Sequence, residues 1–140
     1  MSRIIKTQNG YRMREKALSL IGKAIYDSNN AITDADKLDI ASFIALSLIE
    51  VMDSVRGTSM AWEKRDYWVK ADQFQAEWMW VEKAKSVLVE AIVAKDYPKI
   101  GEVYHELKKN RKILEGMIKT RKKIDYTGSY HRLKTKYLGS

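Results

Sequence analysis

Residues 33–57 read TDADKLDIASFIALSLIEVMDSVRG, and this stretch decides the fold. The hydroxyl of Thr33 can cap the first turn of a helix, and Asp34 and Asp36 lie where the helix dipole favours negative charge. The apolar residues that follow occupy most of the circumference of a helix: Leu38, Ile40, Ala41, Phe43, Ile44, Ala45, Leu46, Leu48, Ile49, Val51 and Met52. We therefore expect a helix that ends before Gly57 and lies at the centre of a bundle.

Helical patterns continue on both sides of this stretch. Residues 11–26 carry an apolar stripe at helical spacing, and the DSNN that follows is a turn signal. Residues 60–95 contain neither proline nor glycine, which predicts one long helix after the RGTS at 56–59. Pro98 suits the first turn of a fourth helix that reaches Lys123 or Ile124, with Asp96 and Tyr97 at the break.

Length and composition indicate one helical domain. The chain has 140 residues, one proline and no cysteine, so disulfides and thiolate zinc sites are excluded and a cytoplasmic location is expected. The apolar run at residues 40–49 is too short for the roughly 20 residues that cross a bilayer, so no membrane span is predicted. We predict an all-α, four-helix bundle-like single domain with one long central helix, over residues 1–124, followed by a basic tail at residues 125–140.

Positive charge is concentrated in the last quarter of the chain. Residues 1–107 hold 15 Lys and Arg against 16 Asp and Glu, whereas residues 108–140 hold 11 against 2. The chain is therefore a near-neutral body with a strongly basic C-terminal part.

The segment KKNRKILEGMIKTRKK, residues 108–123, places its lysines along one side of the predicted fourth helix, with Gly116 in the row. Like charges three and four residues apart repel, and a polyanion would compensate them. We therefore predict contact with the backbone of RNA or DNA; a solvated face, an acidic protein or a membrane surface are the alternatives. The predicted basic contact residues are Lys108, Lys109, Arg111, Lys112, Lys119, Arg121, Lys122 and Lys123.

The tail alternates aromatic rings with cations, as in proteins that bind single strands. Tyr126 and Tyr130 are predicted to stack on bases, and Arg132, Lys134 and Lys136 to hold the backbone. In the alternative, the tail tyrosines dock on the bundle. Basic residues near the N-terminus extend the same surface if the first and fourth helices are neighbours: Arg3, Lys6, Arg12, Arg14 and Lys16.

Four tryptophans lie between residues 62 and 80. Trp68 and Trp78 belong to the stripe expected to face the core. Trp62, Val69 and Trp80 follow the same period on roughly the opposite side, and we predict that they form an interface with another protein chain.

No pattern indicates catalysis. His105 and His131 lack an accompanying nucleophile arrangement, and Glu102 with His105 is a single Glu-x-x-His pair where a di-iron site needs two. We expect neither an enzyme nor a metal or other cofactor.

A near-neutral helical body with one basic face and an aromatic row resembles the small all-helical subunits of CRISPR effector ribonucleoproteins. The resemblance implies a non-catalytic subunit of an antiviral defence complex that binds nucleic acid and packs beside other subunits. A helical scaffold or self-assembling protein, including a viral coat or filament protein, would show the same features, so it stays open as the alternative.

Overall fold

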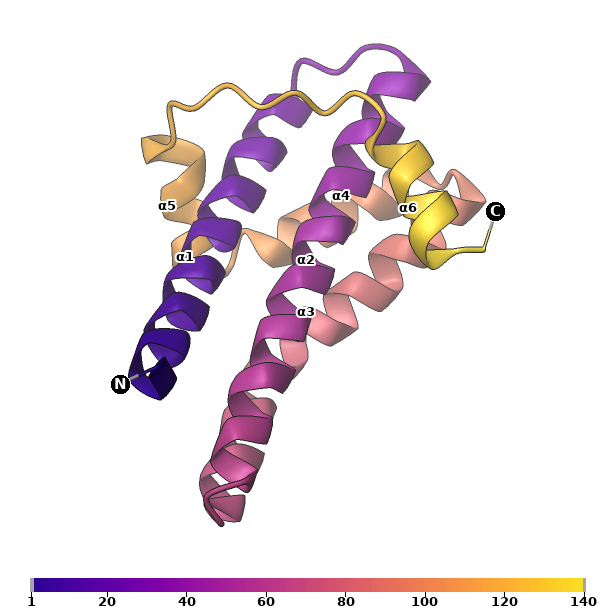
Figure 1. Cartoon of the computed structure of the whole chain (residues 1–140). Helices are drawn as coiled ribbons and strands as arrows, with labels where there is room; N and C mark the ends of the chain where they lie inside the picture. Colours follow the sequence, from indigo (N-terminus) through magenta and orange to yellow (C-terminus); the bar gives the residue numbers. More distant parts are fainter. Residues whose placement is uncertain (1, 140) are drawn as a thin grey trace.

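The computed structural model describes residues 2–139, and the side chains of residues 10–139. These residues form six helices and no strand (Figure 1). The helices are α1 (Ser2–Ser28), α2 (Asp34–Glu63), α3 (Trp68–Ala94), α4 (Tyr97–Leu107), α5 (Arg111–Lys119) and α6 (Ser129–Tyr137). The all-α prediction is confirmed, whereas the predicted number of helices was too small.

Helix α2 lies at the centre, as its apolar pattern predicted, and packs against α1, α3 and α6. Its N-terminus is the predicted one, because the hydroxyl of Thr33 accepts a hydrogen bond of 3.1 Å from the amide of Asp36. Ile44, Ala45 and Leu48 of α2 are fully buried, together with Ile21 of α1. Helices α1, α2 and α3 thus form a bundle-like core.

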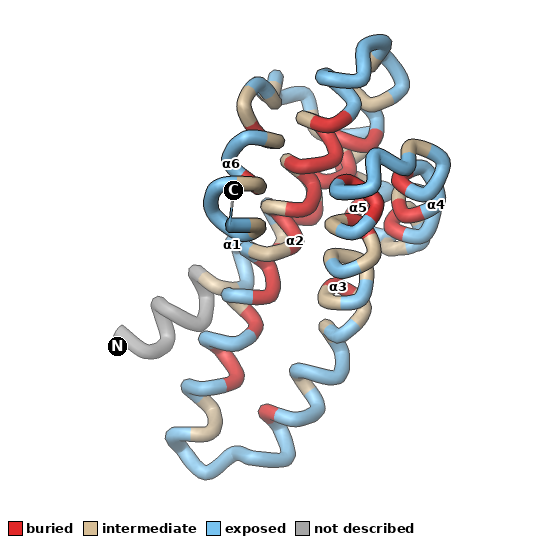
Figure 2. The backbone as a smooth tube through the Cα atoms, turned by 90° about the vertical axis from the view of Figure 1, so that its right-hand side faces the viewer, coloured by how far each residue is buried: buried red, intermediate tan, exposed pale blue. Residues whose placement is uncertain are grey.

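The break after α2 is not at Gly57, as predicted, but begins seven residues later, at Lys64. Helix α2 continues through Gly57 to Glu63, and the turn lies at residues 64–67, where Asp66 adopts a left-handed φ of 64°. The predicted single helix over residues 60–95 is therefore wrong. The last turns of α2 and the first turns of α3 form a hairpin that projects from the body (Figure 1), and exposed residues predominate towards its tip (Figure 2).

The predicted fourth helix is two helices. Helix α4 begins as expected, with Asp96 as its N-cap and Pro98 in its first turn, but it ends at Leu107. Asn110 then caps α5 by accepting hydrogen bonds from the amides of Lys112 (2.9 Å) and Ile113 (3.2 Å). The charged row predicted along one continuous helix is therefore interrupted.

This break changes which residues are buried. On one continuous helix, Leu114 would lie seven residues after Leu107 and share its buried face. Instead Ile113 is fully buried, while Leu114 is 45% and Ile118 75% exposed. The helical register that α4 would continue is thus lost at the break before α5.

The chain after α5 crosses the bundle and returns to α2. Residues 120–126 are extended and run from α5 over the end of α1 to α6 (Figure 1). Helix α6 packs on α2, where Leu133 is fully buried and the amide of Tyr130 donates a 3.0 Å hydrogen bond to Asp39. The predicted tail is thus ordered against the chain's own bundle.

Candidate nucleic-acid interface

Two glycines fix the position of α5. A Cβ built on Gly22 of α1 would overlap the carbonyl oxygen of Ile113, and one built on Gly116 would overlap the carbonyl oxygen of Ser19. Because neither glycine has a side chain, the backbones of α1 and α5 come into direct contact. Gly116, which lies in the lysine row predicted from the sequence, is therefore covered by α1 of the same chain.

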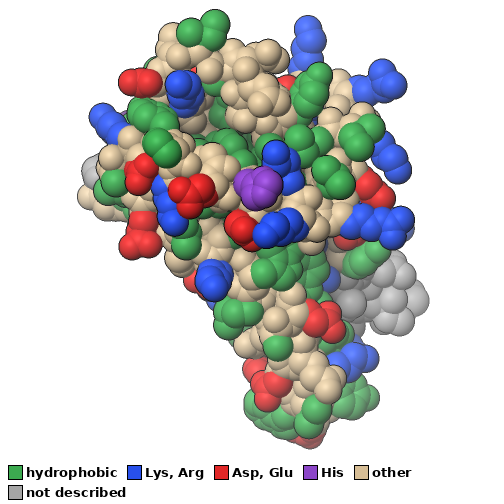
Figure 3. Space-filling model, turned by 180° about the vertical axis from the view of Figure 1, so that it is seen from behind, with side chains coloured by type: hydrophobic (Ala, Val, Ile, Leu, Met, Phe, Trp, Pro, Cys, Tyr) green, Lys and Arg blue, Asp and Glu red, His purple; other side chains and the backbone are tan. Residues whose placement is uncertain are grey.

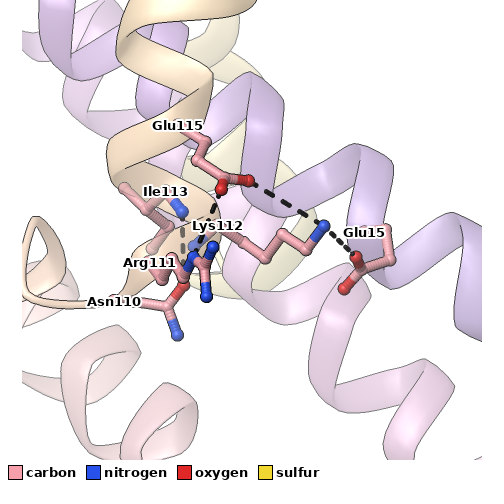
Figure 4. Close-up of polar contacts among 6 residues, drawn as sticks. All are labelled: Glu15, Asn110, Arg111, Lys112, Ile113 and Glu115. Carbon is pink, nitrogen blue, oxygen red and sulfur yellow. Dashed lines mark hydrogen bonds and ion pairs between the residues drawn. The ribbon is translucent and has the colours of Figure 1, made fainter.

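Three of the predicted phosphate contacts are already in ion pairs, and Figure 4 shows the pairs of Arg111 and Lys112. Lys112 Nζ lies 2.9 Å from Glu15 Oε1 of α1 and 3.9 Å from Glu115 Oε1. Arg111 Nε lies 3.3 Å from Glu115 Oε2, and Lys109 Nζ lies 3.0 Å from Glu106 Oε1. The ion pair between Lys112 and Glu15 could not be predicted from the sequence, because the two residues are almost a hundred positions apart.

These pairs change the acidity of their members. The hydrogen bond from Lys112 to Glu15, together with the charge of Glu15, raises the pKa of Lys112 above its ordinary value. The hydrogen bond from Lys109 lowers the pKa of Glu106. Both groups therefore stay charged at neutral pH, and α5 is held to α1 partly by charge.

Lys108 differs from its neighbours. It is half-buried at the end of α4, beside a hollow of about 350 Å³ that is also lined by Tyr97 and Tyr104. Burial raises the pKa of Tyr104, so this phenol stays neutral. Lys108 therefore lines a hollow to which no residue of α5 contributes.

Four of the predicted basic residues form a continuous exposed group at the end of α5 and in the extended segment after it. They are Lys119, Arg121, Lys122 and Lys123, which we call the basic strap. Within the described part of the chain, no ion pair involves any of them. Figure 1 places α5 on the left of the molecule, which is the right-hand side of Figure 3 because that view is turned by 180°. Lys and Arg side chains project along this edge in Figure 3.

The strap is held at both of its ends. At one end, α5 packs on α1; at the other, the Tyr126 hydroxyl donates a 2.6 Å hydrogen bond to Asp27 Oδ2 of α1, and its ring meets Phe43 of α2 edge-on at 5.1 Å. Burial and this hydrogen bond raise the pKa of Tyr126. Tyr126 therefore serves as an anchor in the bundle, and the prediction that it stacks on a base is not supported by its position.

The remaining tail residues lie on α6. Tyr130 is half-buried with Lys134 Nζ 4.5 Å from the centre of its ring. Arg132 donates to the Ser129 hydroxyl at 3.1 Å, and Lys136 lies beside Tyr137. These cations are at the far end of residues 120–126 from α5, so they do not continue the strap as a single row (Figure 1).

The three residues predicted to contact another chain do not form one helical row. Trp62 belongs to α2, where its ring meets that of Phe74 edge-on at 5.0 Å and Lys70 Nζ lies over its face. Trp80 belongs to α3 and stacks on Trp78, with ring centres 6.2 Å apart. Only Val69 is largely exposed, at 71%. Trp68, which we placed in the core, is 56% exposed on the hairpin, and it lies there because the helix breaks at residues 64–67.

Arg14 was predicted as a surface cation and is instead buried, with 4% of its surface exposed. The sequence signal is its position on the inner stripe of α1, four residues before the buried Leu18. The side chains of Arg3 and Lys6 lie outside the described residues, and Arg12 and Lys16 are exposed on α1.

Among the side chains that the structure describes, no three His, Asp or Glu residues are grouped so that they could hold a metal ion. None of the helices in residues 2–139 is long and apolar enough to cross a bilayer. No family model, no curated protein and no solved structure matches the chain.

Proposed function

We propose that the protein is a non-catalytic nucleic-acid-binding subunit of a larger assembly, and that the basic strap contacts the phosphate backbone. The observation that carries this proposal is the state of four cations: Lys119, Arg121, Lys122 and Lys123 are exposed and outside any ion pair among the described residues. Such cations release condensed counterions from a nucleic acid when they neutralise its phosphates.

The extended backbone of the strap supports this proposal. An extended segment advances about 3.3 Å per residue, so neighbouring cations can follow a strand of phosphates more closely than side chains around a helix do. Because Tyr126 and α5 hold the two ends, little conformational freedom is lost on binding. Nothing in this arrangement reads bases, so we expect binding that tolerates any sequence.

A small subunit of a CRISPR effector ribonucleoprotein is the specific assembly that we propose. The size of the chain, its helical body and the separation of the strap from the apolar hairpin tip fit a subunit that contacts nucleic acid on one side and protein on another. The resemblance in architecture and charge placement is its support.

Fluorescence anisotropy with labelled single-stranded RNA, single-stranded DNA and duplex DNA tests the proposal. The variant Arg121→Glu/Lys122→Glu/Lys123→Glu reverses three charges of the strap. The matched control is Lys64→Glu/Arg65→Glu/Lys83→Glu, which reverses two charges in the turn at residues 64–67 and one on α3. We expect the strap variant to lose binding and the control to retain it. Equal affinities for the two variants would contradict the role of the strap.

A second candidate function is a helical scaffold that acts through contacts between proteins. It is favoured by large apolar side chains that are exposed on the hairpin: Met60 (56%), Tyr67 (54%), Trp68 (56%) and Val69 (71%). Under this hypothesis the wild type self-associates without nucleic acid, and Trp68→Ser/Val69→Ser is monomeric. Analytical ultracentrifugation of both chains, with and without RNA, separates the two functions.

A further inference from the structure

A groove lies between residues 10–13 of α1 and the last turns of α2, and the two helices run antiparallel (Figure 1). Its volume is about 640 Å³. The described residues that line it include apolar side chains, two hydroxyl groups and two cations, but no carboxylate: Gly10, Met13, Ser54, Gly57, Thr58, Met60, Ala61, Trp62, Lys64 and Arg65. The groove is therefore apolar with positive charge at its rim.

A third cation lies behind the wall of the groove. Arg14 Nη1 donates to Ser54 Oγ (2.8 Å) and to Thr58 Oγ1 (3.2 Å), and both hydroxyls line the groove. A Cβ built on Gly10, which also lines it, would lie only 3.3 Å from the same nitrogen. The guanidinium is thus separated from the groove by a glycine and two short side chains.

Arg14 has no carboxylate partner among the described residues. Its guanidinium carbon lies 5.0 Å from the ring centre of Phe74 and 5.5 Å from that of Trp78, and its Nε has no hydrogen-bond partner. A buried charge without a counterion is costly, and the rings compensate only part of this cost. An anion in the groove would supply the missing compensation.

Gly57 leaves the groove open. It lies in the interior of α2, where glycine costs about 1 kcal/mol relative to alanine. A Cβ built on it meets no atom within 4 Å, and its φ is not positive, so neither packing nor backbone geometry requires a glycine. Because Gly57 has no side chain, the part of the groove next to Ser54 and Thr58 stays unfilled.

We propose that this groove binds an acidic, apolar segment of a protein partner. A carboxylate of the partner pairs with Lys64 and Arg65 and compensates Arg14 through the hydroxyls of Ser54 and Thr58. Its apolar side chains pack against residues that include Met13, Met60 and Trp62. A peptide fits better than a nucleic-acid base, because Lys70 Nζ already lies 4.9 Å over the Trp62 ring and Phe74 meets that ring edge-on. The groove and the basic strap share no residue, so this inference does not depend on the proposed function.

The test uses a pair of labelled peptides, Ac-ALEALLEALLEA-NH2 and the same peptide with glutamine in place of each glutamate. Gly57→Leu fills the groove without a backbone clash, and Gly101→Leu is the matched control, since a Cβ on this α4 glycine also meets nothing within 4 Å. Circular dichroism and thermal unfolding establish that each variant folds. Anisotropy and amide chemical shifts of the full chain report binding up to millimolar peptide.

We expect the glutamate peptide to bind the wild type and Gly101→Leu, and to bind Gly57→Leu about tenfold more weakly or less. The glutamine peptide should also bind the wild type about tenfold more weakly, and Arg14→Met should reduce this preference. Equal binding of the two peptides, unchanged binding to Gly57→Leu, or no binding at all would overturn the proposal. So would a loss of RNA binding by Gly57→Leu, which would assign the groove to nucleic acid.

Discussion

Gly22 and Gly116 meet where α1 crosses α5: a Cβ added to Gly22 would lie 3.0 Å from the carbonyl carbon of Gly116. This crossing holds α5 against α1, and α5 carries the first residue of the basic strap. The position of the basic strap therefore depends on Gly22 and Gly116, two residues that have no side chain.

Alanine at this crossing should destabilise the fold. A Cβ at Gly22 or Gly116 overlaps backbone atoms that can only move if the helices separate, so we expect each substitution to cost about 1–3 kcal/mol. Gly57→Ala is the matched control in α2; it should be neutral or stabilise by about 0.5–1 kcal/mol. Urea unfolding followed by circular dichroism measures all three, and equal stabilities would show that the crossing is not tightly packed.

Tyr126 should contribute to stability through its hydroxyl. Tyr126→Phe keeps the ring on Phe43 but removes the hydrogen bond to Asp27, which we expect to cost about 1–2 kcal/mol. Tyr137→Phe changes an exposed phenol on α6 and should be neutral. Hydrogen exchange should also become faster in residues 120–128 of the Tyr126→Phe chain only. If the two variants unfold alike, Asp27 does not anchor the strap.

Stability should fall in alkaline solution. The pKa of Tyr126 is raised above its ordinary value of 10.0, mainly by burial and then by the bond to Asp27, so the folded state favours the neutral phenol. This contribution is complete below about pH 10 and is lost as the pH rises further, because the unfolded chain ionises first. The raised pKa values of Tyr104 and Lys112 act in the same direction.

Urea unfolding at a series of pH values from 8 to 11 measures this loss. The free energy of unfolding of the wild type should decrease above about pH 10, and Tyr126→Phe should decrease less steeply because it has lost one of the titrating groups. A stability that stays constant up to pH 11 would contradict the burial of these phenols.

Lys112 and Lys122 should behave differently when replaced by alanine. Lys112 is paired with Glu15 and Glu115, so its loss should slightly destabilise the attachment of α5 and change RNA affinity little. Lys122 is exposed on the strap, so its loss should lower RNA affinity and leave stability unchanged. Thermal unfolding and anisotropy distinguish the two variants. A loss of RNA affinity in Lys112→Ala, with none in Lys122→Ala, would contradict this assignment and favour the lysine row predicted from the sequence.

The parts of the fold that were predictable have local chemical signals. The start of α2 at its Thr33 cap and the start of α4 at Asp96 and Pro98 both follow from capping residues. The central position of α2 follows from an apolar pattern that covers most of its surface.

The missed features depend on contacts that are distant in sequence or on backbone geometry without a sequence marker. Asp66 and Lys95 adopt left-handed φ values of 64° and 54°, where a glycine would have marked the helix end. Gly57 looked like such a marker and lies inside a helix. Asn110, between Lys109 and Arg111, is a recognisable helix cap, but the charged row expected along one helix led us to overlook it.

The candidate site was predictable as a region and not as a set of residues. The concentration of charge after residue 107 is a property of the sequence. The sequence does not show which of these cations are paired. Glu15 comes close to Lys112 only because α1 and α5 cross at Gly22 and Gly116.

Contact between the strap and phosphates should be visible in the salt dependence of binding to single-stranded RNA. The slope of log affinity against log salt should be smaller by about 2 for Arg121→Ala/Lys122→Ala/Lys123→Ala than for the wild type, since each phosphate contact on a single strand contributes about 0.7. Lys64→Ala/Arg65→Ala/Lys83→Ala should keep the slope of the wild type. The same slope for all three proteins, or no binding by the wild type at low salt, would contradict the claim.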